Sequence, residues 1–346
     1  SPIQQMLLGV GAVATKTYID DVFSTYVYEG DGTTNHQIVN GIDLATHGGL
    51  IWGKERGNSG SHYQFDTVRG LNKRLKSNSD SAEETDTFYS SVNSNGYTIN
   101  KTTSVNVDGN DYASWTFRKA PGFFDVVTYT GNGVQGRNIS HNLGSVPGAI
   151  WVKKLNSTGD WQCYHRSLGA TKYLRLNSDL EATTSSSRWD NTTPTSTYFR
   201  VGDNGTVNNN DDTYVAYLFA HDEQSFGENE NASVIKCGSY EGNNNDDGTE
   251  VSLGWEPSFL LIKSIDTSDN WCIFDNLRGM TADGINDEAL FPNASDAEAA
   301  GNYLTPTSTG FKLTTQSDRV NNNSTYIYLA IRRSDGYVGK PPELGT

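Results

Sequence analysis

The segment Tyr214-Val-Ala-Tyr-Leu-Phe-Ala220 decides the fold class, and the chain holds two counterparts of it. In Tyr112-Ala-Ser-Trp-Thr-Phe-Arg118 aromatic residues alternate with small or polar ones, and the run from Tyr326 to Arg333 is again largely apolar. Alternation with a period of two predicts a β-strand with one buried face, and a continuous apolar run of strand length predicts a central strand. We therefore expect three similar β units, each closed by one of these strands.

Other elements recur in the same order ahead of each closing strand. A Tyr–x–Gly turn begins at Tyr28, Tyr129 and Tyr240, and an apolar strand then ends at Lys54, Lys153 and Lys263. Further shared positions are Asp66-x-x-Arg69-Gly70, His165-x-x-Leu168-Gly169 and Asp275-x-x-Arg278-Gly279. Repetition at a fixed pitch of about a hundred residues indicates self-contained units rather than a solenoid.

A polar stretch follows in each unit: Asn78 to Glu83, Asn177 to Ala182 and Asn293 to Glu298. Asp or Ser can cap a helix and Glu can follow, so each stretch is expected to start one helical turn. Asn-Gly and Asp-Gly pairs such as Asn95-Gly96 and Asn204-Gly205 predict hairpin turns or bulges, because these turns need positive φ.

The predicted class is all-β, with three tandem β-sandwich domains of jelly-roll type. The predicted boundaries are an N-terminal segment at 1–22, repeats at 23–121, 122–224 and 225–339, and a linker at 340–346. Consecutive prolines in that last stretch stop both helix and central strand.

Composition narrows the function classes. The net charge is −15 and no block of Lys and Arg stands out, so we expect no nucleic-acid partner. Three cysteines without a CxxC suggest neither a disulfide framework nor a zinc site.

The N-terminal run from Met6 to Ala14 is apolar but far shorter than the ~20 residues that span a bilayer. We expect no membrane insertion. Instead the run is expected to dock onto a particle or a neighbouring subunit, through Met6, Leu7, Leu8, Val10 and Val13, or to pack against its own first domain.

Chemical motifs are absent from the sequence: it has no P-loop, HExxH or GxSxG, and no GxGxxG of the dinucleotide-binding kind. We expect no enzymatic activity, no cofactor and no metal site. An Asn- and Asp-rich loop at 243–247 resembles the start of a calcium loop, but Gly254 stands where the twelfth-position Glu belongs. Polar loops at 208–212 and 321–324 precede the closing strand at matching places. A solvated turn is therefore favoured there over a Ca²⁺ site.

Trp189 and Trp255 lie outside the strongest strand patterns, and of the seven tryptophans Trp189 is the best candidate for exposure. Exposed aromatic rings can stack on sugars, so these two residues are candidate glycan contacts. Packing in the core or at its rim is nevertheless favoured over that role for both.

Several segments resemble a repeated domain of unknown function in tail-fibre-like virion proteins of tailed bacteriophages, especially marine ones. They are Phe23 to Tyr28, Phe123 to Gly133, Tyr164 to Tyr173, Tyr214 to Phe219 and Ala330 to Tyr337, and the N-terminal Ser-Pro-Ile-Gln-Gln-Met-Leu-Leu-Gly also fits. The resemblance implies a virion part and supplies no catalytic residue.

Together these features predict a non-enzymatic virion structural protein, in a tail fibre or appendage, with a role in host adhesion. The expected partners are other virion proteins, further copies of the chain in a homo-oligomer such as a trimer, and a host surface glycan. The expected location is the virion, assembled in the host cytoplasm. A host-glycan-binding module and a capsid decoration protein are the alternatives.

Overall fold

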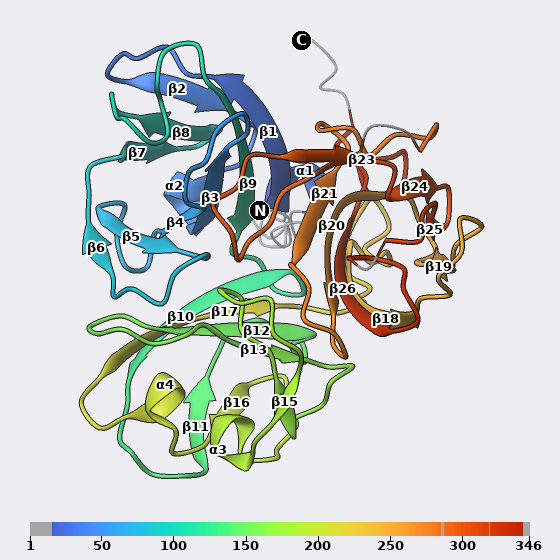
Figure 1. The fold of residues 1–346 in the computed structure, drawn as a ribbon. Coiled ribbons are helices and arrows are strands. Elements are labelled where there is room, and N and C mark those ends of the chain that lie inside the picture. Colours follow the sequence, from blue (N-terminus) through green and yellow to red (C-terminus); the bar gives the residue numbers. More distant parts are fainter. Residues whose placement is uncertain (1–15, 285–286, 318, 342–346) are drawn as a thin grey trace, which may run out of the picture.

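The computed structural model describes residues 16–284, 287–317 and 319–341, and it is all-β (Figure 1). Antiparallel sheets carry the fold. The described helices have four residues each: α1 (Ile19–Val22), α2 (Leu44–His47), α3 (Ser186–Trp189) and α4 (Gly205–Asn208). The predicted fold class is therefore confirmed at the level of an all-β, sandwich-like protein. Within the described residues, no helix is long and apolar enough to cross a membrane.

Three main sheets share one topology, in which the first strand of the unit pairs with its last strand, and the last with the third. The first is ordered β1 (Phe23–Glu29), β9 (Asp111–Arg118), β3 (Gly49–Glu55), β4 (Tyr63–Asp66), β5 (Lys73–Lys76), β6 (Glu84–Thr85). The second is ordered β10 (Phe124–Thr130), β17 (Thr213–Phe219), β12 (Ala149–Lys154), β13 (Gln162–His165). The third is ordered β18 (Ile235–Glu241), β26 (Thr325–Arg332), β20 (Pro257–Ser264), β21 (Cys272–Asp275). We call β1–β9, β10–β17 and β18–β26 the first, second and third units.

Smaller sheets accompany each main sheet. The first unit has β2 (His36–Val39), β8 (Gly96–Ile99) and β7 (Tyr89–Asn93); the second has β11 (Arg137–Ser140) with β16 (Tyr198–Val201), and β14 (Lys172–Tyr173) with β15 (Thr183–Thr184). The third has β19 (Glu250–Ser252), β25 (Gly310–Leu313) and β24 (Leu304–Thr307), and β22 (Asp287–Ala289) with β23 (Ala299–Gly301). The hairpin expected at Asn95-Gly96 joins β7 to β8, whereas Asn204 caps α4 instead of turning a hairpin.

The main sheets are buried on both faces, and this explains their continuous apolar strands. In β3, Ile51 packs with the small sheet of its own unit, whereas Leu50 and Trp52 face a core shared with the other units. In β20, Leu260 likewise faces the core of its own unit, and Leu261 faces the shared core. Because successive side chains of a strand point to opposite faces, a strand between two cores must be apolar throughout.

One tyrosine pair recurs in every unit. Tyr28 stacks on Tyr112, Tyr129 on Tyr214 and Tyr240 on Tyr326, each with ring centroids 5.1 Å apart. The first ring of each pair donates its hydroxyl to a loop carbonyl, and the second accepts a backbone N–H from the same loop. The Tyr–x–Gly signal of the sequence therefore marks the packing of this loop on the main sheet.

Three expectations need correction. The polar stretches that begin at Asn78, Asn177 and Asn293 are extended connectors, not helical turns, because their backbone groups bond across the boundaries between units. Residues 19–22, expected to lie in the N-terminal segment, form α1 and contribute Ile19 and Val22 to the shared core. The units do not each bury their strands independently, since that core draws side chains from all three.

Candidate functional site at the boundaries between the units

The units close into a ring by hydrogen bonds that have the same register at all three boundaries. Glu83 N–H donates to Leu155 O, Ala182 N–H to Ile265 O and Glu298 N–H to Arg56 O, over 2.7–2.9 Å. A second set runs from Gly159 N–H to Asp80 O, from Asp269 N–H to Asp179 O and from Gly60 N–H to Ser295 O, over 2.7–2.9 Å. The order first to second, second to third and third to first makes the arrangement pseudo-threefold, as the three groups of sheets in Figure 1 illustrate.

Aromatic side chains fill the centre of the ring. Phe117 has ring contacts with Phe23 and Phe123, and with Phe219 and Phe259 of the other two units, at centroid distances of 5.0–6.3 Å. Trp52 contacts Trp115 and Trp151 at 5.5 and 5.6 Å. Aromatic pairs contribute about 0.5–1.5 kcal/mol beyond the area that they bury. The centre therefore couples the three units into one packed body.

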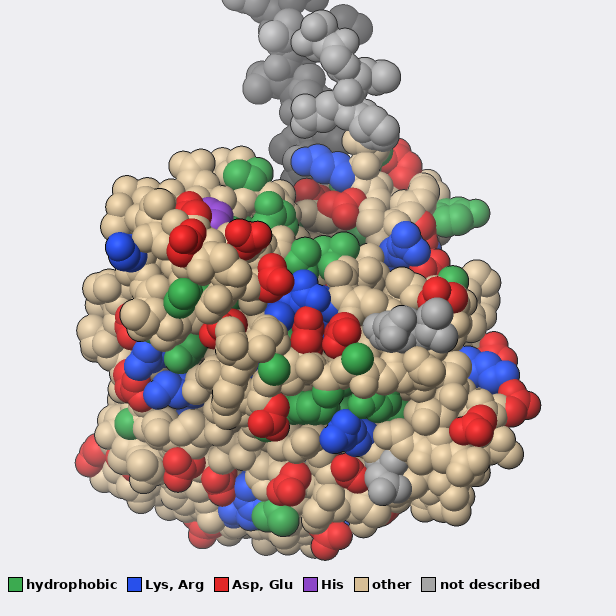
Figure 2. Space-filling view, turned by 45° about the horizontal axis from the view of Figure 1, so that its top comes forward, with side chains coloured by type: hydrophobic (Ala, Val, Ile, Leu, Met, Phe, Trp, Pro, Cys, Tyr) green, Lys and Arg blue, Asp and Glu red, His purple; other side chains and the backbone are tan. Residues whose placement is uncertain are grey.

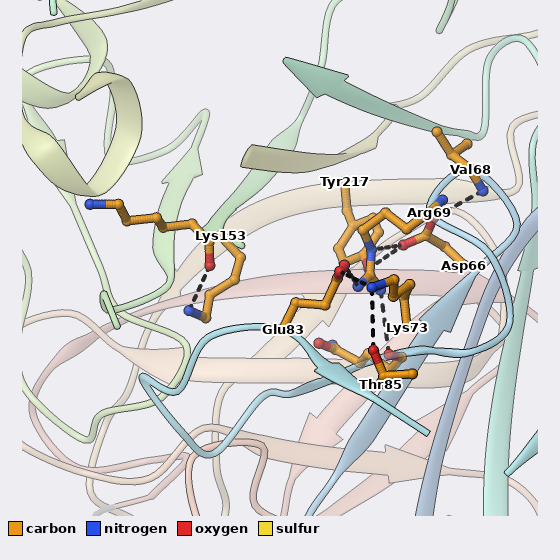
Figure 3. A network of polar contacts seen from close by, with 10 residues as sticks. Asp66, Val68, Arg69, Lys73, Glu83, Thr85, Lys153 and Tyr217 are labelled. Atoms are coloured by element: carbon orange, nitrogen blue, oxygen red, sulfur yellow. Dashed lines mark hydrogen bonds and ion pairs between the residues drawn. The ribbon is translucent and has the colours of Figure 1, made fainter. Parts of the chain in front are cut away.

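A buried ion network crosses the boundary between the first and second units (Figure 3). The guanidinium of Arg69 bonds to Asp66 Oδ2 at 2.5 Å and to Glu83 Oε2 at 2.8 Å, and Asp66 Oδ2 also accepts the hydroxyl of Tyr217 at 2.8 Å. The Asp66 and Arg69 side chains are at most 2% exposed. Two further N–H groups, of Val68 and Arg69, donate to Asp66 Oδ1. The hydrogen bonds of this carboxylate compensate its burial.

The boundary between the third and first units carries the matching network. Arg278 bonds to Asp275 Oδ2 at 2.7 Å and to Glu298 Oε2 at 3.3 Å. Asp275 Oδ2 accepts the indole N–H of Trp115 at 2.9 Å, so Trp115 takes the place that Tyr217 has at the other boundary. The guanidinium also lies 5.4 Å from the Trp115 ring centroid, which adds a cation–π contact.

The remaining boundary, between the second and third units, has none of the three charged residues that form the ion network at the other two. His165, Leu168 and Ala182 stand where the other units have Asp, Arg and Glu. His165 Nε2 lies 3.1 Å from Tyr328 O, and burial lowers the pKa of this histidine to about 4, so the ring is neutral at pH 7. The three positions have changed together, as expected where one unpaired buried charge would be costly.

A buried lysine ends the same strand of each unit. Lys54, Lys153 and Lys263 are at most 1% exposed, and burial lowers the pKa of each to about 8. Each ammonium donates to the carbonyl of the next residue and to one further carbonyl. For Lys153 that second acceptor is Asp80 O of the first unit, at 3.1 Å. These lysines therefore satisfy carbonyls of loops at or near the boundaries.

Buried asparagine side chains hold together the Asn-rich loops, for which the sequence favoured a solvated turn over a calcium site. We call each of these side chains, with the groups it binds, an asparagine clamp. Asn208 is fully buried, and its side-chain N–H₂ donates to Asn132 Oδ1, Val134 O and Gly202 O. Asn321 and Asn106 make corresponding bonds in the other units. In the described part of the chain, no group of three or more His, Cys, Asp and Glu side chains is placed to hold a metal ion.

The two tryptophans proposed as glycan contacts are buried, so the choice of Trp189 as the best candidate for exposure is wrong. Trp189 is 1% exposed and packs against Tyr164 with ring centroids 5.9 Å apart, and Trp255 is 5% exposed within the core of the third unit. Neither ring offers a face for a sugar. The predicted docking residues Met6, Leu7, Leu8, Val10 and Val13 lie outside the described residues.

Asp287 is the aspartate with the most clearly raised pKa, about 6, and burial is the main cause. Its Oδ2 accepts the backbone N–H groups of Tyr303 and Leu304, both at 2.8 Å. This carboxyl group therefore joins β22 to the start of β24.

Across the face that Figure 2 presents, acidic and basic side chains are interspersed, with apolar ones between them.

Sequence reasoning detected Asp66, Arg69, Glu83 and their counterparts as repeated positions, but not that they meet across unit boundaries. The repeat itself was the signal: two units share Asp, Arg and Glu while one has changed all three. The sequence could not indicate which residues bind the two aspartates across the boundaries, since Tyr217 and Trp115 lie in other units.

Comparison with known proteins gives one family. No curated protein matches the chain. A family model described as a domain of unknown function, DUF7483, matches residues 19–334, which run from the start of α1 to just past the end of β26. One model thus covers the whole ring of three units, and the chain belongs to the DUF7483 family.

Proposed function

We propose that this protein is a non-enzymatic structural component of a tailed-bacteriophage virion, in a tail fibre or appendage, with a role in host adhesion. The resemblance of its repeats to tail-fibre-like virion proteins motivates the proposal. The observation that carries it is the closed ring, whose boundaries hold two buried ion networks and one shared aromatic core. Such a body resists deformation, as a projecting part of a particle must.

Each unit is in this view a β-sandwich domain, and the three are tandem copies of jelly-roll type. The main sheet and the small sheet of a unit enclose a core of their own in the first and third units. Further copies of the chain would assemble into a homo-oligomer, and a trimer is one arrangement.

The ends of the described chain favour attachment at one face. Ile19 N–H donates to Val338 O, Gly227 N–H to Thr17 O and Lys340 N–H to Asp20 Oδ2, each at 2.9 Å. The described residues nearest the two ends of the chain, 17–20 and 338–340, therefore lie close together, which leaves the rest of the ring free to face a host. The apolar N-terminal segment would dock onto the particle or a sister chain.

Labelling of intact particles with an antibody against this protein tests the proposal. Label on the tail or its appendages supports it. Label on the head favours a capsid decoration protein, and a protein absent from washed particles contradicts a virion role. Deleting residues 1–16 should leave a folded ring, judged by its unfolding transition, and abolish incorporation. Incorporation at normal levels contradicts the docking role of Met6, Leu7, Leu8, Val10 and Val13.

A further inference from the structure

The second unit has a polar pocket of about 520 Å³ beside its boundary with the third unit. Ser145, Tyr164, Arg166, Thr193, His221 and Glu223 line it. Pockets that bind small molecules commonly enclose ~300–1,000 Å³ and carry a few convergent polar groups. The volume therefore suits a single sugar residue.

The third unit differs at the residue that corresponds to Ser145. A shared Leu-Gly-x-x-Pro motif begins at Leu143 and Leu253, and both glycines have positive φ, so Ser145 corresponds to Trp255. Trp255 is buried in the core cluster that contains Phe274, the counterpart of Tyr164.

A second difference lies beside it. In the third unit Arg333 bonds to Glu256 at 2.5 Å, and strand register places His221 and Val146 at these two positions in the second unit. The third unit keeps a smaller pocket of about 230 Å³ at Arg333, so the two units differ in the volume and the lining of the pocket rather than in its presence.

The groups that line the pocket have unused bonding capacity. Ser145 is 6% exposed, and its hydroxyl oxygen is buried without a hydrogen-bond partner in the described structure. Arg166 is exposed, and among the described residues no carboxylate lies within ion-pairing distance of it. It stands where the other units have Thr67 and Asn276, so the fold does not require a cation there. A free charge beside an unpaired buried hydroxyl indicates a site built for a ligand.

The charges of the lining select the class of ligand. Arg166 offers a planar fork of donors that matches a carboxylate. His221 Nδ1 accepts the N–H of Cys237 at 3.1 Å, so its other nitrogen carries the proton, and burial lowers its pKa to about 4, which keeps it neutral. The Glu223 carboxylate, at the same pocket, can accept hydrogen bonds from hydroxyl groups.

We propose that this pocket binds an acidic sugar residue, with its carboxylate on Arg166 and Ser145 and its hydroxyl groups toward Glu223. The proposal deepens the adhesion role proposed above and rests on it, because a surface glycan is then the host feature recognised. It replaces Trp189 as the candidate sugar contact: Trp189 lies behind the pocket, packed on Tyr164.

Saturation-transfer NMR and titration calorimetry on the full chain test the site with two matched pairs of sugars, galacturonate against galactose and glucuronate against glucose. We expect a uronate to bind and its neutral partner to bind at least about tenfold more weakly, a difference of about 1.4 kcal/mol. Equal binding of both members of a pair, or binding of neither uronate, overturns the proposal. Equal competition by inorganic phosphate also overturns it, in favour of a general anion site.

Variants localise the binding. Arg166→Gln, at an exposed position, should weaken uronate binding at least about tenfold without changing the unfolding transition. Ser145→Trp should abolish binding by filling the pocket. Arg333→Gln, at the counterpart of His221, is the control and should bind normally. Unchanged affinity in Arg166→Gln contradicts the site.

The two proposals can fail separately. Particle labelling decides the virion role without any sugar, and the binding experiment needs no particle. A protein found on particles that binds no uronate loses only the sugar site, whereas a protein that binds uronate but is absent from particles loses the virion role.

Discussion

The hydroxyl of Tyr217 donates to Asp66 Oδ2 over 2.8 Å, and this bond joins the central strand of the second unit to the first unit. The same carboxylate oxygen bonds to Arg69, whose guanidinium continues to Glu83. A carboxylate that is fully buried between two units is stable there only because each of these partners is present.

Removing Arg69 alone should therefore be costly. We expect Arg69→Leu to lower the free energy of unfolding by about 3–5 kcal/mol, because Asp66 loses its counter-charge while fully buried, although Glu83 keeps Lys73 at 3.4 Å. The triple variant Asp66→His, Arg69→Leu, Glu83→Ala copies the residues of the uncharged boundary, and it should be more stable than the single variant. Denaturant unfolding measures both.

A matched control exists at the surface of the second unit. Arg200 pairs with Asp190 at 3.5 Å and is 32% exposed, so Arg200→Leu should cost less than about 1 kcal/mol. A triple variant less stable than Arg69→Leu would show that the network cannot be replaced as a set.

The shared aromatic core predicts cooperative unfolding of the whole chain. Phe117→Ala removes a ring that contacts both other units, and it should lower the free energy of unfolding by about 3–5 kcal/mol. Differential scanning calorimetry should give one transition in the parent chain and in the variant, with calorimetric and van't Hoff enthalpies in agreement. Three separate transitions would contradict a common core.

The buried lysines predict a contribution to stability that rises in mild alkali. Burial lowers the pKa of Lys54, Lys153 and Lys263 to about 8, whereas an unfolded lysine titrates near 10.4. Between these values an unfolded lysine holds more protons than a folded one, so each lysine raises the free energy of unfolding as the pH increases. The contribution is at most about 3 kcal/mol for each lysine, at 1.36 kcal/mol per pH unit. The three buried cysteines act in the opposite direction above about pH 8.5, because burial raises their pKa and only the unfolded chain then loses these protons. Buried tyrosines with raised pKa, such as Tyr217, do the same above about pH 10.

Denaturant midpoints measured between pH 7 and 10 separate these effects. Lys153→Met removes one of the three titrating lysines, so its stability should rise less with pH, or fall more, than that of the parent chain. Lys340→Met, at an exposed position, should leave the slope unchanged. Equal slopes for Lys153→Met and the parent chain would contradict the assignment.

The asparagine clamp predicts that the loop at residues 131–136 is held in place by the side-chain amide of Asn208. Asn208→Asp keeps the size of the side chain but removes three donated bonds and adds a buried charge, so it should cost at least about 2 kcal/mol. Asn244→Asp, at an exposed residue of the corresponding loop in the third unit, is the control and should cost little. Hydrogen exchange should rise in residues 131–136 of the clamp variant, and added Ca²⁺ should not reverse that rise.

The repeat made much of the fold predictable. Three copies of the same pattern, from the Tyr–x–Gly turn to the closing strand, indicated all-β units and located their central strands at β9, β17 and β26. Local signals were less reliable. Asn95-Gly96 does form a hairpin, but Asn204-Gly205 begins a helix, because a capping side chain satisfies the same backbone equally well.

Exposure could not be predicted from local pattern. Trp189 follows Ser185-Ser-Ser-Arg188 and precedes Asp190 and Asn191, a polar setting typical of a loop, yet its ring is buried beneath Tyr164. The pocket of the second unit was equally unpredictable, since its volume and lining depend on how the fold brings Ser145, Tyr164 and His221 together.

The sequence by itself determined the strand content, the number of units and the positions that the units share, because these depend on side-chain periodicity and turn chemistry along the chain. Only the tertiary structure decided that the units close on one another, that Asp66 meets Tyr217 and Asp275 meets Trp115, and that each main sheet is covered on both faces. Those contacts join residues far apart in the chain, and their energies come from burial and charge pairing in three dimensions, which no local pattern records.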